Sequence, residues 1–85
     1  SLAEYIDVPR EHKYYGSVQL ASMYGLLEPM SYPTENNAGM FGIDELITSG
    51  DIARLTERAK ITLPALTEDM TRGEAVDIVV KAMEK

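Results

Sequence analysis

The chain has 85 residues, which is enough for one small domain but too few to bury a large core. It contains no cysteine, which excludes disulfides and thiolate metal sites, and no apolar run of the roughly 18 residues expected of a membrane span. The net charge of -6, from 8 basic and 14 acidic residues, argues against a nucleic-acid binder, because such proteins present a basic face. The chain begins with Ser1, and we interpret it as an excised piece of a longer protein or as a mature form.

The first predicted helix covers residues 11–27. Tyr14, Val18 and Ala21 share one helical stripe, and small residues along the segment keep the helix slim enough for close packing against another helix. Pro29 ends this helix. Residues 28–45 follow with two prolines, two glycines and an asparagine pair, so they are predicted to form a long loop.

Two later segments, residues 46–60 and 69–85, share one phrase: an apolar residue, Thr, one further residue, Gly and an acid. In the second segment, Thr71 and Glu74 have the spacing of a capping box, in which each side chain bonds the backbone N–H of the other residue. Thr48 and Asp51 offer a shorter version of the same start. The phrase therefore predicts helices over residues 49–60 and 72–84.

The paired glycines of the phrase have no propensity advantage in a first helical turn. Gly50 and Gly73 are therefore predicted to face a close neighbour that leaves no room for a Cβ atom. The last helix is apolar on most sides, which predicts that it is buried. Together these patterns predict an all-α fold, a small three-helix domain with a long connecting loop.

Several parts of the chain match the pattern of an S-layer homology repeat in order and spacing. The matching positions near the start are Tyr5, Asp7, Val8, His12, Tyr14, Tyr15, Val18, Leu20, Ala21, Gly25 and Leu26. Further on, they are Phe41 with Ile47-Thr48-Ser49-Gly50-Asp51, and Met70-Thr71-Arg72-Gly73-Glu74, which is the better match in wording. The chain thus resembles a member of the S-layer homology family over most of its length.

The doubled phrase allows two arrangements of this S-layer-homology-like domain, which spans residues 1–85. In the first, residues 5–60 form one repeat-like unit, and residues 61–85 carry the second motif on a helix that belongs to a truncated neighbour. In the second, residues 30–70 hold an insertion, and the second phrase closes the only repeat. The sequence leaves both arrangements open.

The resemblance implies a non-catalytic module at the bacterial cell surface that anchors a larger protein to secondary cell-wall polysaccharide. By resemblance, Arg72 is the candidate for contacting an anionic sugar substituent, and Thr71, Gly73 and Glu74 shape the helix start around it. An Arg gains nothing from the positive end of a helix dipole, so we expect Arg72→Ala to weaken glycan binding and to leave folding nearly unchanged. At the first phrase, Ser49 replaces this Arg, which argues against binding there.

A second function class fits the same residues. The acidic charge, Ser49 and the missing repeats favour a helical module that packs against a neighbouring domain of the same protein, or against a protein partner, without glycan binding. One His and no Cys leave only carboxylates for acid–base chemistry, so we expect no catalytic residues and no enzyme activity. No phosphate-binding loop, calcium loop or zinc spacing is present, so we expect no metal site and no cofactor.

Overall fold

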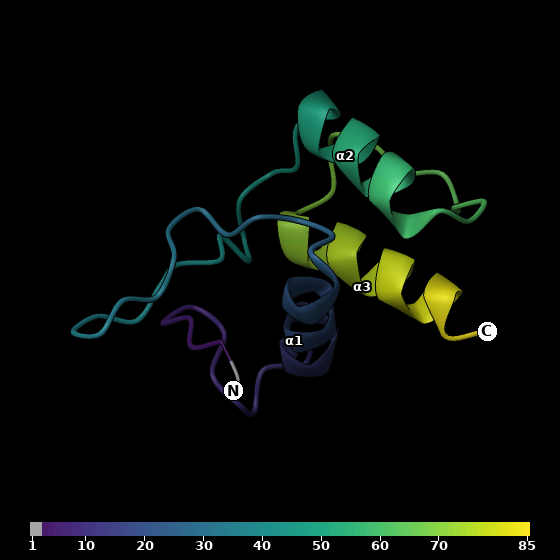
Figure 1. Cartoon of the computed structure of the whole chain (residues 1–85). Helices are drawn as coiled ribbons and strands as arrows, with labels where there is room; N and C mark the ends of the chain where they lie inside the picture. Colours follow the sequence, from purple (N-terminus) through teal and green to yellow (C-terminus); the bar gives the residue numbers. More distant parts are fainter. Residues whose placement is uncertain (1–2) are drawn as a thin grey trace.

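The computed structural model describes residues 3–85, and this part of the chain contains three helices: α1 (Tyr15–Tyr24), α2 (Ser49–Ala59) and α3 (Arg72–Met83). The β-structure within residues 3–85 consists of isolated bridges only. The prediction of a small all-α domain with a long connecting loop is therefore confirmed. The molecule measures 38 × 24 × 21 Å, and the loop of residues 28–45 extends away from the helices (Figure 1).

Helix α1 is shorter than the predicted range of 11–27 at both ends. Before it, the chain forms turns in which the N–H of His12 donates to the carbonyl of Pro9 and the N–H of Tyr15 donates to the carbonyl of His12, both at 2.9 Å. At the other end, Gly25 has a φ of 65°, in the left-handed region that glycine adopts without strain. Apolar residues at helical spacing continue beyond both ends of α1. The sequence pattern therefore overestimates the length of the helix.

Helices α2 and α3 begin where the threonine caps predict. The Thr48 hydroxyl accepts a hydrogen bond from the N–H of Asp51 at 3.1 Å. Thr71 and Glu74 form both halves of a capping box, each at 3.1 Å. Each helix ends one residue before its predicted end, and Lys60 ends α2 in the left-handed conformation with a φ of 58°. The prediction of these two helices is therefore confirmed to within one residue.

Helix α3 lies between the other two helices and supplies much of the core (Figure 1). Its side chains Ala75, Val76, Val79 and Val80 are buried, as the apolar composition of this helix predicts. Helix α1 and helix α2 contribute buried side chains to the same cluster. Each fully buried aliphatic side chain stabilises the fold by roughly 1.5–3 kcal/mol, so this cluster holds the three helices together.

The main packing partner of α1 is α3 rather than α2. In addition to the apolar contacts, the Ser17 hydroxyl of α1 donates to the Asp77 carboxylate of α3 at 2.6 Å. Helices α1 and α2 do not pack on each other, and α2 lies on the opposite side of α3 (Figure 1). Both arrangements of the repeated phrase stay predictions.

Asp7 joins the N-terminal segment to the end of the long loop. Its carboxylate accepts hydrogen bonds from three consecutive backbone N–H groups, those of Phe41, Gly42 and Ile43, at 2.9, 2.7 and 2.8 Å. Burial by itself raises the pKa of Asp7, but the three N–H donors outweigh burial and hold the pKa below its ordinary value of 3.8. The ionised carboxylate therefore stabilises the folded position of residues 41–43.

We expect the free energy of unfolding to decrease as the pH falls below 3.8, the ordinary pKa of an Asp side chain. A carboxyl with a lowered pKa in the folded state contributes its full stabilisation above its unfolded-state pKa and loses it as the pH falls through its folded-state pKa. Urea unfolding of the wild type and of Asp7→Asn near neutral pH and at about pH 3 measures this contribution. Asp7→Asn should be less stable near neutral pH and should lose less stability on acidification.

The control is Asp44→Asn, which removes an exposed carboxylate that has no side-chain hydrogen bond in the described chain. This variant should follow the wild type at both pH values. If Asp7→Asn shows the same loss on acidification as the wild type, Asp7 does not stabilise residues 41–43 through its charge.

Candidate functional site at the start of helix α3

The predicted site residues Thr71, Arg72, Gly73 and Glu74 lie together at the N-cap and first turn of α3. The strand-like segment before α2 runs beside them, and Leu46 forms an antiparallel bridge with Thr71. This bridge places the start of α3 beside the beginning of the segment that leads into α2. The site is therefore enclosed by chain segments that are distant from it in the sequence.

The backbone N–H groups at this helix start all have partners within the protein. The N–H groups of Arg72 and Gly73 donate to the carbonyls of residues 45 and 43, at 2.8 and 3.1 Å. The N–H groups of Thr71 and Glu74 are bound within the capping box. A helix N-terminus binds an anion through free N–H groups, and this one has none to offer.

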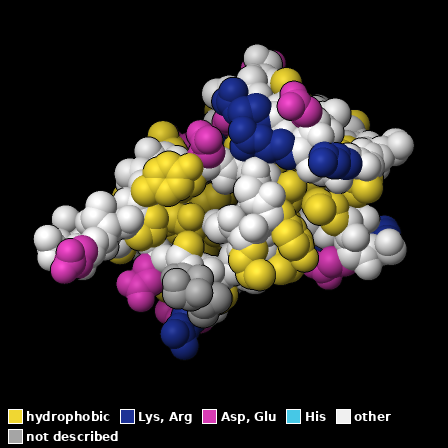
Figure 2. Space-filling view, in the orientation of Figure 1, with side chains coloured by type: hydrophobic (Ala, Val, Ile, Leu, Met, Phe, Trp, Pro, Cys, Tyr) yellow, Lys and Arg dark blue, Asp and Glu magenta, His cyan; other side chains and the backbone are white. Residues whose placement is uncertain are grey.

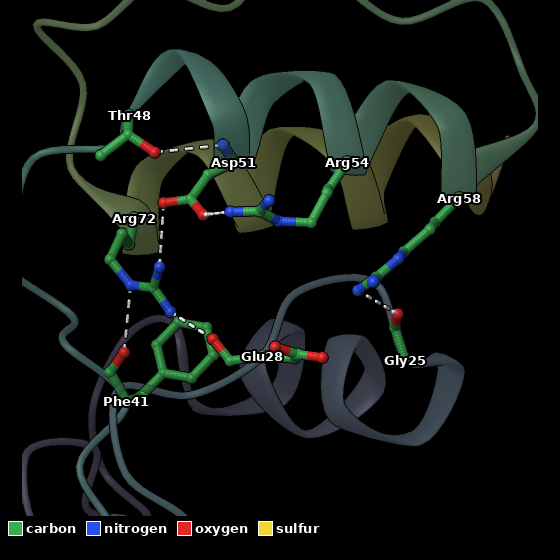
Figure 3. A network of polar contacts seen from close by, with 8 residues as sticks. All are labelled: Gly25, Glu28, Phe41, Thr48, Asp51, Arg54, Arg58 and Arg72. Carbon is green, nitrogen blue, oxygen red and sulfur yellow. Dashed lines mark hydrogen bonds and ion pairs between the residues drawn. The ribbon is translucent and has the colours of Figure 1, made fainter.

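The Arg72 side chain points inward and is buried, with the residue 6% exposed. Its Nε donates to the carbonyl of Phe41 at 3.1 Å, and one terminal nitrogen donates to the carbonyl of Glu28 at 2.5 Å. Its other terminal nitrogen binds the carboxylate of Asp51 at 3.1 Å (Figure 3). The guanidinium also lies over the Phe41 ring, 5.2 Å from its centroid, which adds a cation–π contact.

Asp51 balances the buried positive charge of Arg72. One of its carboxylate oxygens binds Arg72, and the other accepts a hydrogen bond from Arg54 at 2.9 Å (Figure 3). Burial raises the pKa of Asp51, but hydrogen bonds from Arg54 and Thr48, together with the charge of Arg72, hold it below the ordinary value. The carboxylate therefore stays ionised near neutral pH, and the buried guanidinium is compensated without any external anion.

Gly73 faces the close neighbour that the sequence predicts, whereas Gly50 does not. A Cβ atom on Gly73 would lie 2.7 Å from a side-chain carbon of Ile43 and 2.9 Å from the Ile43 carbonyl oxygen. A Cβ atom on Gly50 would meet nothing closer than an Arg54 nitrogen at 3.5 Å, an ordinary contact. The prediction is therefore confirmed for α3 and wrong for α2, because only the start of α3 is covered by another segment.

The expectation that Arg72→Ala leaves folding nearly unchanged does not agree with this arrangement. Arg72 is buried, and it joins three segments of the chain that lie 21, 31 and 44 residues away in the sequence. The sequence shows only that an Arg is a poor fit to the local helix dipole. The long-range contacts that compensate for this position are not visible in the local pattern.

Two carboxylates complete this region, and each has a wider role than its local sequence pattern predicts. The sequence predicts that Asp51 is an acid of the helix start, and the structure shows that it also neutralises Arg72. Asp7 is a matching position of the S-layer homology pattern. In the structure its carboxylate accepts a hydrogen bond from the N–H of Phe41, and the carbonyl of Phe41 accepts one from Arg72. The sequence signal for such contacts is that a small domain contains both acidic and basic side chains. This signal does not indicate which of them form pairs.

Among residues 3–85, no group of three or more His, Cys, Asp or Glu side chains is arranged to hold a metal ion. None of the helices in the described part of the chain is long and apolar enough to cross a membrane.

No protein-family model, no curated protein and no solved structure matches this chain. The resemblance to S-layer homology repeats therefore stays a prediction that rests on the residues of the sequence.

We expect Arg72→Ala to lower the free energy of unfolding by about 3 kcal/mol or more, because it removes three hydrogen bonds of a buried side chain and leaves the Asp51 carboxylate with only the half-exposed Arg54 as a charge partner. Arg54→Ala is the matched control, since both arginines bind the same carboxylate, but the Arg54 side chain is 51% exposed and that of Arg72 is 8% exposed. The control should lose less than about 1 kcal/mol. Urea unfolding measures both losses.

Arg72→Lys keeps the positive charge but not the planar fork of donors. Its free energy of unfolding should therefore lie between that of the wild type and that of Arg72→Ala. This variant also gives a readout if Arg72→Ala does not fold. Equal losses for Arg72→Ala and Arg54→Ala would show that burial gives Arg72 no special part in the fold.

The two glycines of the repeated phrase should respond to alanine in opposite directions. Gly73→Ala forces a Cβ atom against Ile43, and such overpacking typically costs about 1–3 kcal/mol. Gly50→Ala has room, and the lower entropy of the unfolded chain should stabilise the protein by about 0.4–1 kcal/mol. Melting temperatures of the two variants test this contrast, and shifts of the same sign and size would contradict it.

Proposed function

We propose that this chain is a non-catalytic helical module that packs against a neighbouring domain or a protein partner, and that it does not bind glycan through residues 71–74. It shares the residue pattern of an S-layer homology repeat but uses the motif Arg for its own fold. A single His and the absence of Cys limit the groups available for acid–base and nucleophilic chemistry, and this supports the non-catalytic part of the proposal.

The burial of Arg72 is the observation that carries this proposal. Its guanidinium is neutralised by Asp51 and bound to two backbone carbonyls, so an anionic sugar would have to break internal contacts to reach it. The backbone N–H groups at the start of α3 are also occupied. An anion would therefore gain few hydrogen bonds at this helix start, and its binding would break internal hydrogen bonds of the protein.

The exposed apolar side chains support packing against another protein surface. Within residues 3–85, eight large apolar side chains are exposed: Ile6, Met23, Tyr24, Met30, Tyr32, Met40, Leu46 and Ile61. Single exposed apolar residues are ordinary, but several of these lie on the long loop and the segments beside it, where they can act together. Apolar side chains gather where this loop meets the helices, while Lys and Arg side chains gather over α2 (Figure 2).

The second candidate is an anchor that binds secondary cell-wall polysaccharide on the outer surface of a bacterial cell. The match of residues 70–74 to the wording of the family pattern favours it. In this case the polysaccharide would contact the module elsewhere than the Arg72 guanidinium, or it would need further repeats. The two candidates make different predictions about glycan binding.

We expect the protein not to co-sediment with purified bacterial cell walls that carry their secondary polysaccharide. The physical reason is that the one motif cation is buried and compensated, while the net charge of -6 repels an anionic polymer. A sedimentation assay at fixed salt, with a triple-repeat S-layer homology protein as the positive control, measures this. Cell walls stripped of polysaccharide serve as the blank.

Saturable sedimentation of the chain with intact walls, and not with stripped walls, would overturn the proposal in favour of the anchor. In that event the same assay with Arg54→Ala and with Arg72→Lys shows which cation contacts the polysaccharide. Arg54 is exposed and Arg72 is buried, and the variant of the contacting residue should bind more weakly.

A further inference from the structure

An open groove lies beside the base of the long loop, with a volume of about 470 Å³. We call it the Met30–Met40 groove. It is distinct from the start of α3, although the two share the segment of residues 42–45. Its walls come from the N-terminal segment, the long loop and the segment before α2, with the lining residues Asp7, Met30, Ser31, Met40, Gly42, Ile43, Asp44 and Glu45.

Two exposed methionines form the apolar part of the groove. Met30 is 58% exposed and Met40 is 40% exposed. Met30 lies close over Gly42, where a Cβ atom would come within 2.4 Å of the methionine sulfur. Gly42 thus makes room for the Met30 side chain, and methionines of this kind adapt their shape to an apolar partner.

Carboxylates surround the methionines, and no Lys or Arg is among the residues that line the groove. Asp44 and Glu45 are exposed, and their side chains have no hydrogen-bond partner in the described chain. The nearest guanidinium, that of Arg72, is buried beneath Gly42 and bound to Asp51. The groove therefore combines an apolar surface with uncompensated negative charge.

The long loop also has a free main-chain edge, which begins at Met30, one of the residues that line the groove. Ser31 and Met40 exchange two backbone hydrogen bonds, at 2.9 and 3.0 Å. The residues on either side of Ser31, Met30 and Tyr32, make no backbone hydrogen bond within the described chain. In an antiparallel pair, the backbone groups of such flanking residues point away from the partner strand, so they are available to another extended chain.

We propose that the Met30–Met40 groove binds an extended segment of a partner protein, in which an apolar side chain and a Lys or Arg side chain stand two residues apart and so point to the same side. The apolar side chain contacts the methionines, the cation pairs with Asp44 and Glu45, and the extended backbone bonds the free edge at Met30 and Tyr32. Peptides that add to a sheet edge commonly gain affinity from backbone bonds and specificity from pockets for their side chains. This inference rests on the proposed function and names the surface and the chemistry of its partner.

The probe is a synthetic peptide of about six residues in which Leu and Lys take turns at the odd positions and Ser fills the even positions, so that an extended chain presents Leu and Lys on the same face. The matched probe replaces each Lys by Glu. Each peptide is titrated into the isotope-labelled protein at fixed salt, and the backbone amide signals are followed by NMR. We expect the Lys peptide to shift the amides of residues 30–32 and 40–45, and the Glu peptide to leave them unchanged.

A pair of charge-reversal variants tests the carboxylates of the groove. Asp44→Lys combined with Glu45→Lys should weaken binding of the Lys peptide by roughly fivefold or more, since each exposed ion pair contributes up to about 1 kcal/mol. The control combines Glu57→Lys with Glu68→Lys, two exposed carboxylates on α2 and the following connection, and it changes the net charge equally. This control should bind within about twofold of the wild type.

Met30→Ser tests the apolar part and should weaken binding of the same peptide with little effect on folding, because Met30 is largely exposed. The groove proposal is overturned if the Lys peptide does not bind, if both double variants weaken it equally, or if its amide shifts lie outside the groove. These outcomes leave the sedimentation result untouched. Binding to cell-wall polysaccharide, by contrast, would overturn the proposed function whatever the peptide does.

Discussion

The buried guanidinium of Arg72 is the interaction on which the arrangement of the chain depends. It binds the end of the segment after α1 through the Glu28 carbonyl, the long loop through the Phe41 carbonyl, and α2 through Asp51. Asp7 holds the same part of the long loop from its other side, through three backbone N–H groups. The long loop is thus fixed at its base by two charged side chains, even though it contains no helix or extended strand.

This use of charge also limits what the start of α3 can do. A helix N-terminus with a motif Arg would suit an anion, yet here the N–H groups and the guanidinium all have internal partners. Exposed methionines and carboxylates line a groove on the surface beside it, and we propose that binding takes place there. The fold thereby separates a structural cation from an accessible apolar and acidic surface, and we propose that this surface meets a protein partner rather than an anionic polymer.

The sequence predicts the features of this fold that depend on neighbouring residues. The caps at Thr48 and Thr71 define the starts of α2 and α3, because a cap needs only a side chain and an N–H group three residues away. The role of Arg72 could not be predicted in this way, since its partners lie 21 to 44 residues away and two of them are backbone carbonyls. Gly50 and Gly73 have the same local setting, and only the tertiary contact with Ile43 makes them different.

A double-mutant cycle between Arg72 and Asp51 tests the central claim most directly, with Arg72→Met and Asp51→Leu as variants that keep apolar volume at both positions. If the two side chains stabilise the fold as a buried pair, Asp51→Leu leaves the Arg72 guanidinium without a carboxylate, Arg72→Met leaves Asp51 with only the half-exposed Arg54, and the double variant removes both charges. The account predicts that the double variant loses at least about 2 kcal/mol less stability than the sum of the two single losses. Losses that add to within about 0.5 kcal/mol would contradict it.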